Sequence, residues 1–179
     1  MKVFWTALLL AVPSVSLCQA IPFEQKGPIA SLTASGSYID GEPQGGHRHS
    51  LWGWSAVPEI KLTRHFGMQA EFASYYMRSI YPGQNRFLMA AGPRYDFSPV
   101  SRITPFIFAE GGEMRLTFKN TLYRDWDPIV KGGVGFEYRL SRSIAITVVP
   151  AEYLAHNEDF GAWDKDFTAR GGITFNLYR

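Results

Sequence analysis

Histidines and carboxylates cluster in two polar segments of the chain, and such groups can bind metal ions. The segments contain His47 and His49 with Asp40 and Glu42, and Glu158 and Asp159 with Asp164 and Asp166. The first set offers the nitrogen and oxygen donors of a transition-metal site, and the second offers the oxygens that calcium prefers. Neither has the ligand spacing of a known metal motif. We therefore expect exposed polar loops, no bound metal and no cofactor.

A larger set of charges recurs at every second residue beside glycine, alanine, serine and threonine. The set is Glu59, Lys61, Glu71, Arg94, Glu110, Lys131, Glu137, Arg139 and Arg170. Both signs are present, and charges that share a narrow interior must pair. We predict that these residues form an internal salt-bridge network that plugs the lumen of a barrel.

The elements that must position these charges are β-strands, because the polarity after Pro28 repeats every two residues. In residues 130–140, one face is apolar and the other carries lysine, glycine, glutamate and arginine. A helix would mix these two sets. Eight such segments are expected, at 29–39, 52–62, 68–76, 87–97, 103–112, 130–140, 144–153 and 168–177.

The expected connections alternate in length. Those at 63–65, 98–102 and 141–143 are short, whereas those at 40–50, 78–86, 116–127 and 154–165 are long. Short turns at one rim and long loops at the other are typical of an up-and-down outer-membrane barrel. The fold class predicted is therefore all-β, a single antiparallel transmembrane barrel of about eight strands. Such a barrel is just filled by side chains, so general porin activity is not expected.

Two features favour a polar lumen and a lipid-facing apolar wall over the opposite arrangement. The polar faces carry small residues and charges of both signs, not the dense Lys and Glu of a solvated face. Aromatic residues gather near strand ends, as interfacial girdles do. They are Tyr38, Trp52, Trp54 and Tyr76 near the long loops, and Phe97 and Tyr138 near the short turns. Pro58, Pro93 and Pro150 interrupt expected strands and predict bulges or strand ends.

The N-terminus has the pattern of a secretory signal peptide. Lys2 precedes an apolar stretch from Val3 to about Val12, and Cys18-Gln19-Ala20 supplies small residues for cleavage. The stretch is shorter than the roughly 20 residues of a spanning helix. We predict a signal peptide at 1–20 and a barrel domain at 21–179. Lipidation of Cys18 is a less favoured alternative, because Leu17 occupies a position that normally takes a small residue.

Composition excludes several other classes of protein. The chain has 179 residues, 46% hydrophobic and 19% charged, with a formal net charge of +2. It is therefore too apolar for a disordered chain. Its basic residues form no stripe that would neutralise nucleic-acid phosphates, so nucleic acid is not an expected partner.

Several short motifs resemble the OmpA-like family of small outer-membrane β-barrel domains. Residues 86–95 contain a Gly-Pro-Arg strand, and residues 103–106 read Ile-Thr-Pro-Phe after a short turn. Residues 132–138 and 170–175 match the same style. The resemblance implies an eight-stranded barrel in the outer membrane of a Gram-negative bacterium, without a cofactor.

One catalytic alternative is a lipid A deacylase of the PagL type. That family places a His-x-Ser-Asn element on a late strand. Here His156 is followed by Asn157 and Glu158, so the serine nucleophile is missing. We expect no enzymatic activity, with His156 at the start of a solvated loop.

The function expected is structural, adhesive or another surface interaction. Expected partners are outer-membrane lipid and lipopolysaccharide, and the barrel-assembly machinery during insertion. The partner of the long loops is unknown. Two alternatives remain open: a soluble secreted or periplasmic barrel that binds a small apolar ligand, and a lipid A-modifying hydrolase.

Overall fold

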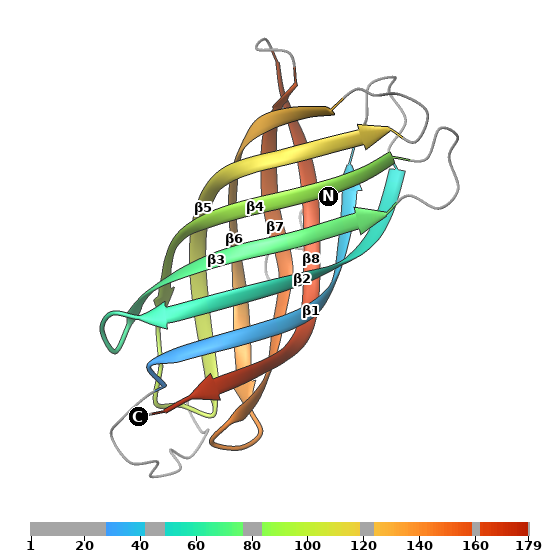
Figure 1. The fold of residues 1–179 in the computed structure, drawn as a ribbon. Helices are drawn as coiled ribbons and strands as arrows, with labels where there is room; N and C mark the ends of the chain where they lie inside the picture. The colour runs from blue at the N-terminus through green and yellow to red at the C-terminus, as the bar shows by residue number, and fades with distance from the viewer. Residues whose placement is uncertain (1–27, 42–48, 77–83, 119–123, 159–161, 179) are drawn as a thin grey trace, which may run out of the picture.

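The computed structural model describes residues 28–41, 49–76, 84–118, 124–158 and 162–178, and these form one closed antiparallel barrel (Figure 1). Each strand pairs with the next along the chain, and β8 pairs with β1 to close the barrel. The strands are β1 (Ala30–Gly41), β2 (His49–Lys61), β3 (Phe66–Tyr76), β4 (Gln84–Asp96), β5 (Ile103–Phe118), β6 (Arg124–Arg139), β7 (Ile144–Glu158) and β8 (Ala162–Leu177). The predicted fold class, with eight strands in sequential order, is confirmed.

The three short turns and the C-terminus lie at the same end of the barrel (Figure 1). Backbone hydrogen bonds close the turns, including Leu62 N to Phe66 O and Leu140 N to Ile144 O, both at 3.0 Å. At the same end, Ile29 N donates to Leu177 O at 3.0 Å and extends the β1–β8 pairing by one residue. The β7–β8 hairpin projects from the opposite end, which we call the long-loop end (Figure 1).

The outer wall of the barrel is apolar. Strand alternation sends one side chain outward and the next inward, and the outward set contains large exposed hydrophobic residues on all eight strands. The belt includes Leu32, Ile60, Met68, Phe72, Tyr95, Ile107, Val130, Val134, Phe136, Ile146, Ile173 and Phe175. The inward set is mainly polar and buried. This distribution is the reverse of a water-soluble barrel and has the pattern of a transmembrane one.

Helices contribute nothing to membrane crossing in the described part of the chain, where no helix is long and apolar enough to span a bilayer.

The later strands are longer than the sequence pattern predicted. β5 continues to Phe118, β6 begins at Arg124, β7 continues to Glu158 and β8 begins at Ala162. The expected long loops at 116–127 and 154–165 are therefore largely strand. The prediction was wrong here because the polarity of the alternation reverses toward this end.

That reversal is visible in the side chains above the apolar belt. Inward positions there are apolar, as at Met114, Leu116 and Leu154, which are all buried. Outward positions include the exposed Glu113 and Lys165. An apolar interior and a charged exterior suit a barrel wall surrounded by water. The long-loop end therefore has the polarity of a wall that has left the bilayer.

Proline accounts for the irregularities of the sheet. Pro150 lies at a β-bulge in β7, where the register shifts between Val149 and Glu152. Pro150 and Ala151 are both exposed, so the inward phase moves from Val149 to Glu152. A bulge of this kind inserts one extra residue into one strand.

The other two strand prolines leave the register unchanged. Pairing between β2 and β3 is interrupted from Val57 to Pro58, and pairing between β4 and β5 from Gly92 to Pro93. In both places the register is the same on the two sides of the gap. The missing pairs are consistent with the absent N–H of proline.

Gly92 lets β4 and β5 approach each other closely at such an interruption. A Cβ atom on Gly92 would overlap the backbone carbonyl of Ala109. We expect Gly92→Ala to destabilise the barrel by about 2 kcal/mol, because backbone must move to accept the methyl group. Urea unfolding in detergent or lipid would measure the change. Gly36→Ala is the control, since nothing lies within 4 Å of its added Cβ. Equal effects at both positions would contradict the close approach.

Candidate functional site

The most distinctive chemistry of this barrel lies inside it, where charged residues from non-adjacent strands meet. At the centre, Glu71 of β3, Lys131 of β6, Glu152 of β7 and Arg170 of β8 form a closed ring of alternating charge, here called the central ring. Lys131 Nζ lies 2.5 Å from Glu71 Oε2 and 2.7 Å from Glu152 Oε2. Arg170 Nη1 lies 2.5 Å from Glu71 Oε2, and its Nε lies 2.8 Å from Glu152 Oε1.

The central ring is almost fully removed from solvent. Lys131 and Glu71 have side-chain exposures of 0%, and Glu152 and Arg170 have 1% and 5%. Because two cations meet two carboxylates, the ring is neutral as a unit. Such geometry can offset the large desolvation cost of burying four charges. The ring also ties β3 to β6 and β8, which share no backbone pairing with it.

A second group, here called the turn-side cluster, lies nearer the short turns and consists of Glu59, Lys61, Arg94, Asp96 and Glu137. Arg94 is its hub and contacts three carboxylates: Glu59 at 3.0 Å, Asp96 at 2.9 Å and Glu137 at 3.2 Å. Lys61 pairs with Glu59 and Asp96. The Arg94 guanidinium also lies 3.8 Å from the centroid of the Phe106 ring, so an aromatic face covers one side of the cation.

A third ion pair lies toward the long-loop end. Arg86 Nη1 of β4 contacts Asp166 Oδ2 of β8 at 2.7 Å, and both side chains have 0% exposure. His156 Nδ1 lies 3.6 Å from the same Asp166 oxygen. The sequence placed His156 at the start of a solvated loop, and that prediction was wrong. His156 is a fully buried residue of β7 because that strand continues to Glu158.

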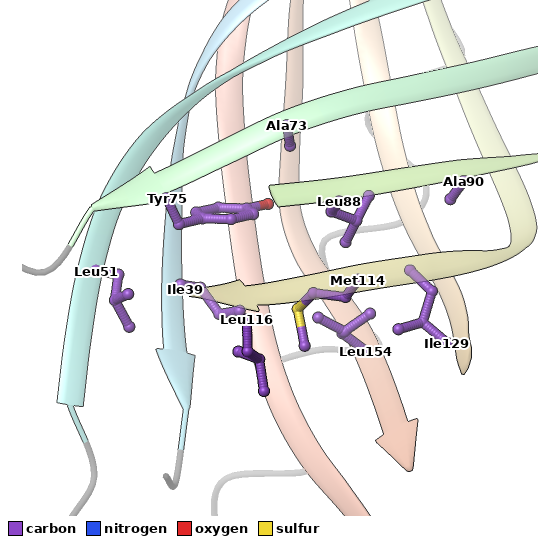
Figure 2. Close-up of a cluster of buried hydrophobic side chains, with 10 residues drawn as sticks. All are labelled: Ile39, Leu51, Ala73, Tyr75, Leu88, Ala90, Met114, Leu116, Ile129 and Leu154. Carbon is purple, nitrogen blue, oxygen red and sulfur yellow. The ribbon is translucent and has the colours of Figure 1, made fainter. Parts of the chain in front are cut away.

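The interior of the long-loop half is apolar (Figure 2). We call this set the apolar layer: Ile39, Leu51, Ala73, Tyr75, Leu88, Ala90, Met114, Leu116, Ile129 and Leu154. Figure 2 shows these side chains coming from several strands toward the same interior region. The lumen therefore contains, in order from the short turns, the turn-side cluster, the central ring and the apolar layer.

All nine charged residues proposed for the lumen lie on the inner face of the wall. Seven are buried, and Lys61 and Arg139 are half-buried near the rim. The structure brings Glu59, Lys61, Arg94 and Glu137 together in the turn-side cluster, and Glu71, Lys131 and Arg170 together in the central ring. The remaining two have other partners. Glu110 accepts a hydrogen bond from Gln69 Nε2 at 2.8 Å, and Arg139 donates to the Pro99 carbonyl at 3.1 Å.

The sequence analysis missed several interior charges. Asp96 could have been found, since it follows Arg94 on the same face. Glu152 was missed because the bulge at Pro150 moves it inward. Arg86 and Asp166 were missed because they lie beyond the expected strand ends.

The candidate metal-binding segments receive different answers. Within the described residues, no group of three or more His, Cys, Asp or Glu side chains is arranged to hold a metal ion. Asp166 is committed to Arg86 inside the barrel. His47, Glu42 and Asp159 lie outside the described residues, as do the side chains of His49 and Glu158.

Comparison with known proteins identifies the fold. No protein-family model matches the chain, and no curated protein matches it. Among solved structures, Neisserial surface protein A (NspA) matches with a TM-score of 0.72 at 10% identity, over 83% of this chain and 97% of that one. Ail, the attachment invasion locus protein of Yersinia pestis, matches with a TM-score of 0.56 at 13% identity, over 86% and 100%. The N-terminal barrel of Pseudomonas aeruginosa OprF matches with a TM-score of 0.56 at 15% identity, over 85% and 100%.

The chain has the fold of the small eight-stranded outer-membrane barrels. The resemblance to OmpA-like barrels noted in the sequence is confirmed at this level. Identities of 10–15% carry the fold alone, so residue roles do not transfer from these proteins.

Proposed function

We propose that this protein is an integral outer-membrane barrel of a Gram-negative bacterium, with a structural or adhesive role at the cell surface and no catalytic activity. The observation that carries the proposal is the inverted polarity of the wall, with an apolar belt outside and paired charges inside. A wall of this kind is stable where lipid surrounds it. Lipid and lipopolysaccharide are then its immediate partners, and the barrel-assembly machinery is its partner during insertion.

The extended long-loop end supports a role in surface interactions. β5 to β8 continue beyond the belt, and their inward side chains contribute to the apolar layer. This gives the long-loop end a packed interior of its own, so it forms a rigid base for the connections at 42–48, 77–83, 119–123 and 159–161. Rigid scaffolds that present loops commonly support recognition. The names of NspA and Ail describe a surface protein and an attachment protein, which agrees with this role.

The interior supports a closed lumen in preference to a ligand cavity or an active site. Two charge groups and the apolar layer occupy successive levels of the barrel. A soluble ligand-binding barrel would instead place its apolar residues around a central cavity. The hydrolase alternative needs an accessible base beside a nucleophile, whereas His156 is fully buried.

Export by a cleaved signal peptide at 1–20 is part of the proposal. The mature protein would begin at Ile21 and contain no cysteine, because Cys18 is the only one in the sequence. An intact mass of the purified protein that corresponds to residues 21–179 supports this processing. A mass that retains Cys18 and an attached lipid would instead show the lipoprotein alternative.

The absence of cysteine from this mature chain gives a direct test of its orientation. Gln44→Cys places a thiol in the connection between β1 and β2, and Ser98→Cys places one in the exposed turn between β4 and β5. We expect a membrane-impermeant maleimide to label Gln44→Cys on intact cells, and Ser98→Cys only after the outer membrane is permeabilised. The permeabilised samples control for thiol reactivity. Equal labelling of the two variants on intact cells would contradict the proposed surface orientation.

A further inference from the structure

Each of the three short turns carries one exposed arginine. Arg64 lies between β2 and β3, Arg102 between β4 and β5, and Arg142 between β6 and β7. No aspartate or glutamate occurs in residues 62–65, 97–102 or 140–143. We call these three residues the turn arginines.

The buried charges nearby do not offset the turn arginines. Within the turn-side cluster, Lys61 and Arg94 face Glu59, Asp96 and Glu137. The half-buried Arg139 supplies a third cation at the same level and donates to the Pro99 carbonyl. These six charges balance among themselves. The described residues at the short-turn rim therefore carry a net positive charge.

Aromatic contacts hold this end of the wall in a defined arrangement. The Arg102 guanidinium lies 5.1 Å from the ring centroid of Tyr138, a residue on the outer face of β6. Arg142 lies 5.0 Å from the ring of Tyr178, immediately after β8. His65, next to Arg64, stacks on the outward Tyr95 at 5.9 Å. Contacts of Arg102 and His65 with the outer wall place these turns beside the apolar belt.

We propose that the turn arginines bind the phosphate groups of anionic phospholipids in the leaflet at the short-turn end. The proposal rests on the membrane location argued above. Guanidinium groups pair well with phosphate oxygens, and basic residues at the edge of an apolar surface attract anionic headgroups. Tyrosine and phenylalanine beneath them, such as Tyr95, Phe97 and Tyr138, suit the interfacial level of a bilayer.

The spacing of the turn arginines favours separate lipids over one compact ligand. Two strands separate successive short turns, which corresponds to about 10 Å along the rim because neighbouring strands lie about 4.8 Å apart. Three cations distributed in this way meet different members of the surrounding lipid ring. A single soluble anion would require them to converge.

Lipid selectivity of the full mature chain tests the proposal. The protein is refolded into phosphatidylcholine vesicles that contain a trace of spin-labelled phosphatidylglycerol or phosphatidylcholine. The fraction of motionally restricted label then reports which lipid the barrel prefers. We expect a preference of about threefold for phosphatidylglycerol at low salt, falling toward one in 0.5 M salt, which is about the range where exposed charges are screened.

Two triple variants locate the preference on the barrel. The first combines Arg64→Gln, Arg102→Gln and Arg142→Gln, and we expect it to lose the preference. The matched control combines Arg115→Gln, Arg124→Gln and Lys165→Gln in β5, β6 and β8 near the long-loop end, and we expect it to keep the preference. Equal preference in both variants, or loss only in the control, would overturn the proposal.

Two further outcomes separate this inference from neighbouring ones. If the wild-type salt titration shows no preference, the proposal is wrong whether or not the variants fold. If the turn variant instead loses binding to peptidoglycan while its lipid preference is unchanged, the arginines face the cell wall and the lipid proposal is wrong. A chain that fails to insert into pure phosphatidylcholine would contradict the proposed function itself, since insertion there needs no anionic lipid.

Discussion

Replacing Glu71 with alanine is expected to lower the free energy of unfolding by about 4 kcal/mol, the range found when one partner of a buried ion pair is removed. Glu71 accepts contacts from both Lys131 and Arg170, and its side chain is fully buried. Without it, two cations remain inside the barrel with Glu152 as the only carboxylate of the central ring. Urea unfolding in lipid vesicles, followed by tryptophan fluorescence, would measure the change.

Two companion variants separate the ion pairs from general effects of losing a side chain. Glu113→Ala removes an exposed carboxylate from the outer face of β5, and we expect it to change stability by no more than about 0.5 kcal/mol. Combining Glu71→Ala with Lys131→Met should cost less than the sum of the two single changes, because each removes the other's unpaired charge. A loss below about 1 kcal/mol for Glu71→Ala would mean that water reaches the central ring.

Placing an arginine on the outer wall at Val134 is expected to cost about 2–4 kcal/mol, the range for a cation at the middle of a bilayer. Val134 is 51% exposed, so the new side chain would fit without steric conflict. It lies four residues from Tyr138 at the short-turn rim, or about 10 Å along the barrel axis for a tilted strand. That depth is close to the centre of a belt about 25 Å tall.

The same substitution at the rim provides the depth control. Leu140 is 52% exposed and follows β6 directly at the short turn. We expect Leu140→Arg to cost about 0–1 kcal/mol, because a cation there reaches the headgroup level. Refolding yields and urea midpoints in vesicles compare the two variants. If Val134→Arg is as mild as Leu140→Arg, the belt is in contact with water and the transmembrane assignment fails.

Much of the fold was predictable because the strand period acts locally. An apolar side chain at Val130, Val134 and Phe136, with Lys131 and Glu137 between them, requires opposite faces whatever the rest of the chain does. The short turns were predictable for a similar reason, since the alternation stops and resumes within a few residues. The lumen side of the wall followed from its small residues and mixed charges.

The upper half of the barrel was less predictable because its environment changes along the axis. Leu116, Ile129 and Leu154 would face lipid if the lower pattern continued, but they point into the apolar layer. A sequence shows that two faces differ, but it does not show where the bilayer ends. The same limit removed Arg86 and Asp166 from the expected strands.

The pairing of interior charges depends on register around a closed sheet, which no local pattern contains. One extra residue at Pro150 decides that Glu152 joins the central ring. Arg94 reaches carboxylates on β2 and β6 because barrel closure brings these strands within range. Composition could therefore predict that the charges pair, but it could not assign their partners.

The most direct test of the central claim is a gel of outer membranes from cells that express the full-length chain. Outer membranes are isolated, and samples are run on a denaturing gel with and without boiling. A closed transmembrane barrel resists detergent until it is boiled, so we predict that the protein is found in this fraction and that its two forms migrate differently. Recovery of the protein in the soluble periplasmic fraction, with the same migration before and after boiling, would contradict the outer-membrane barrel.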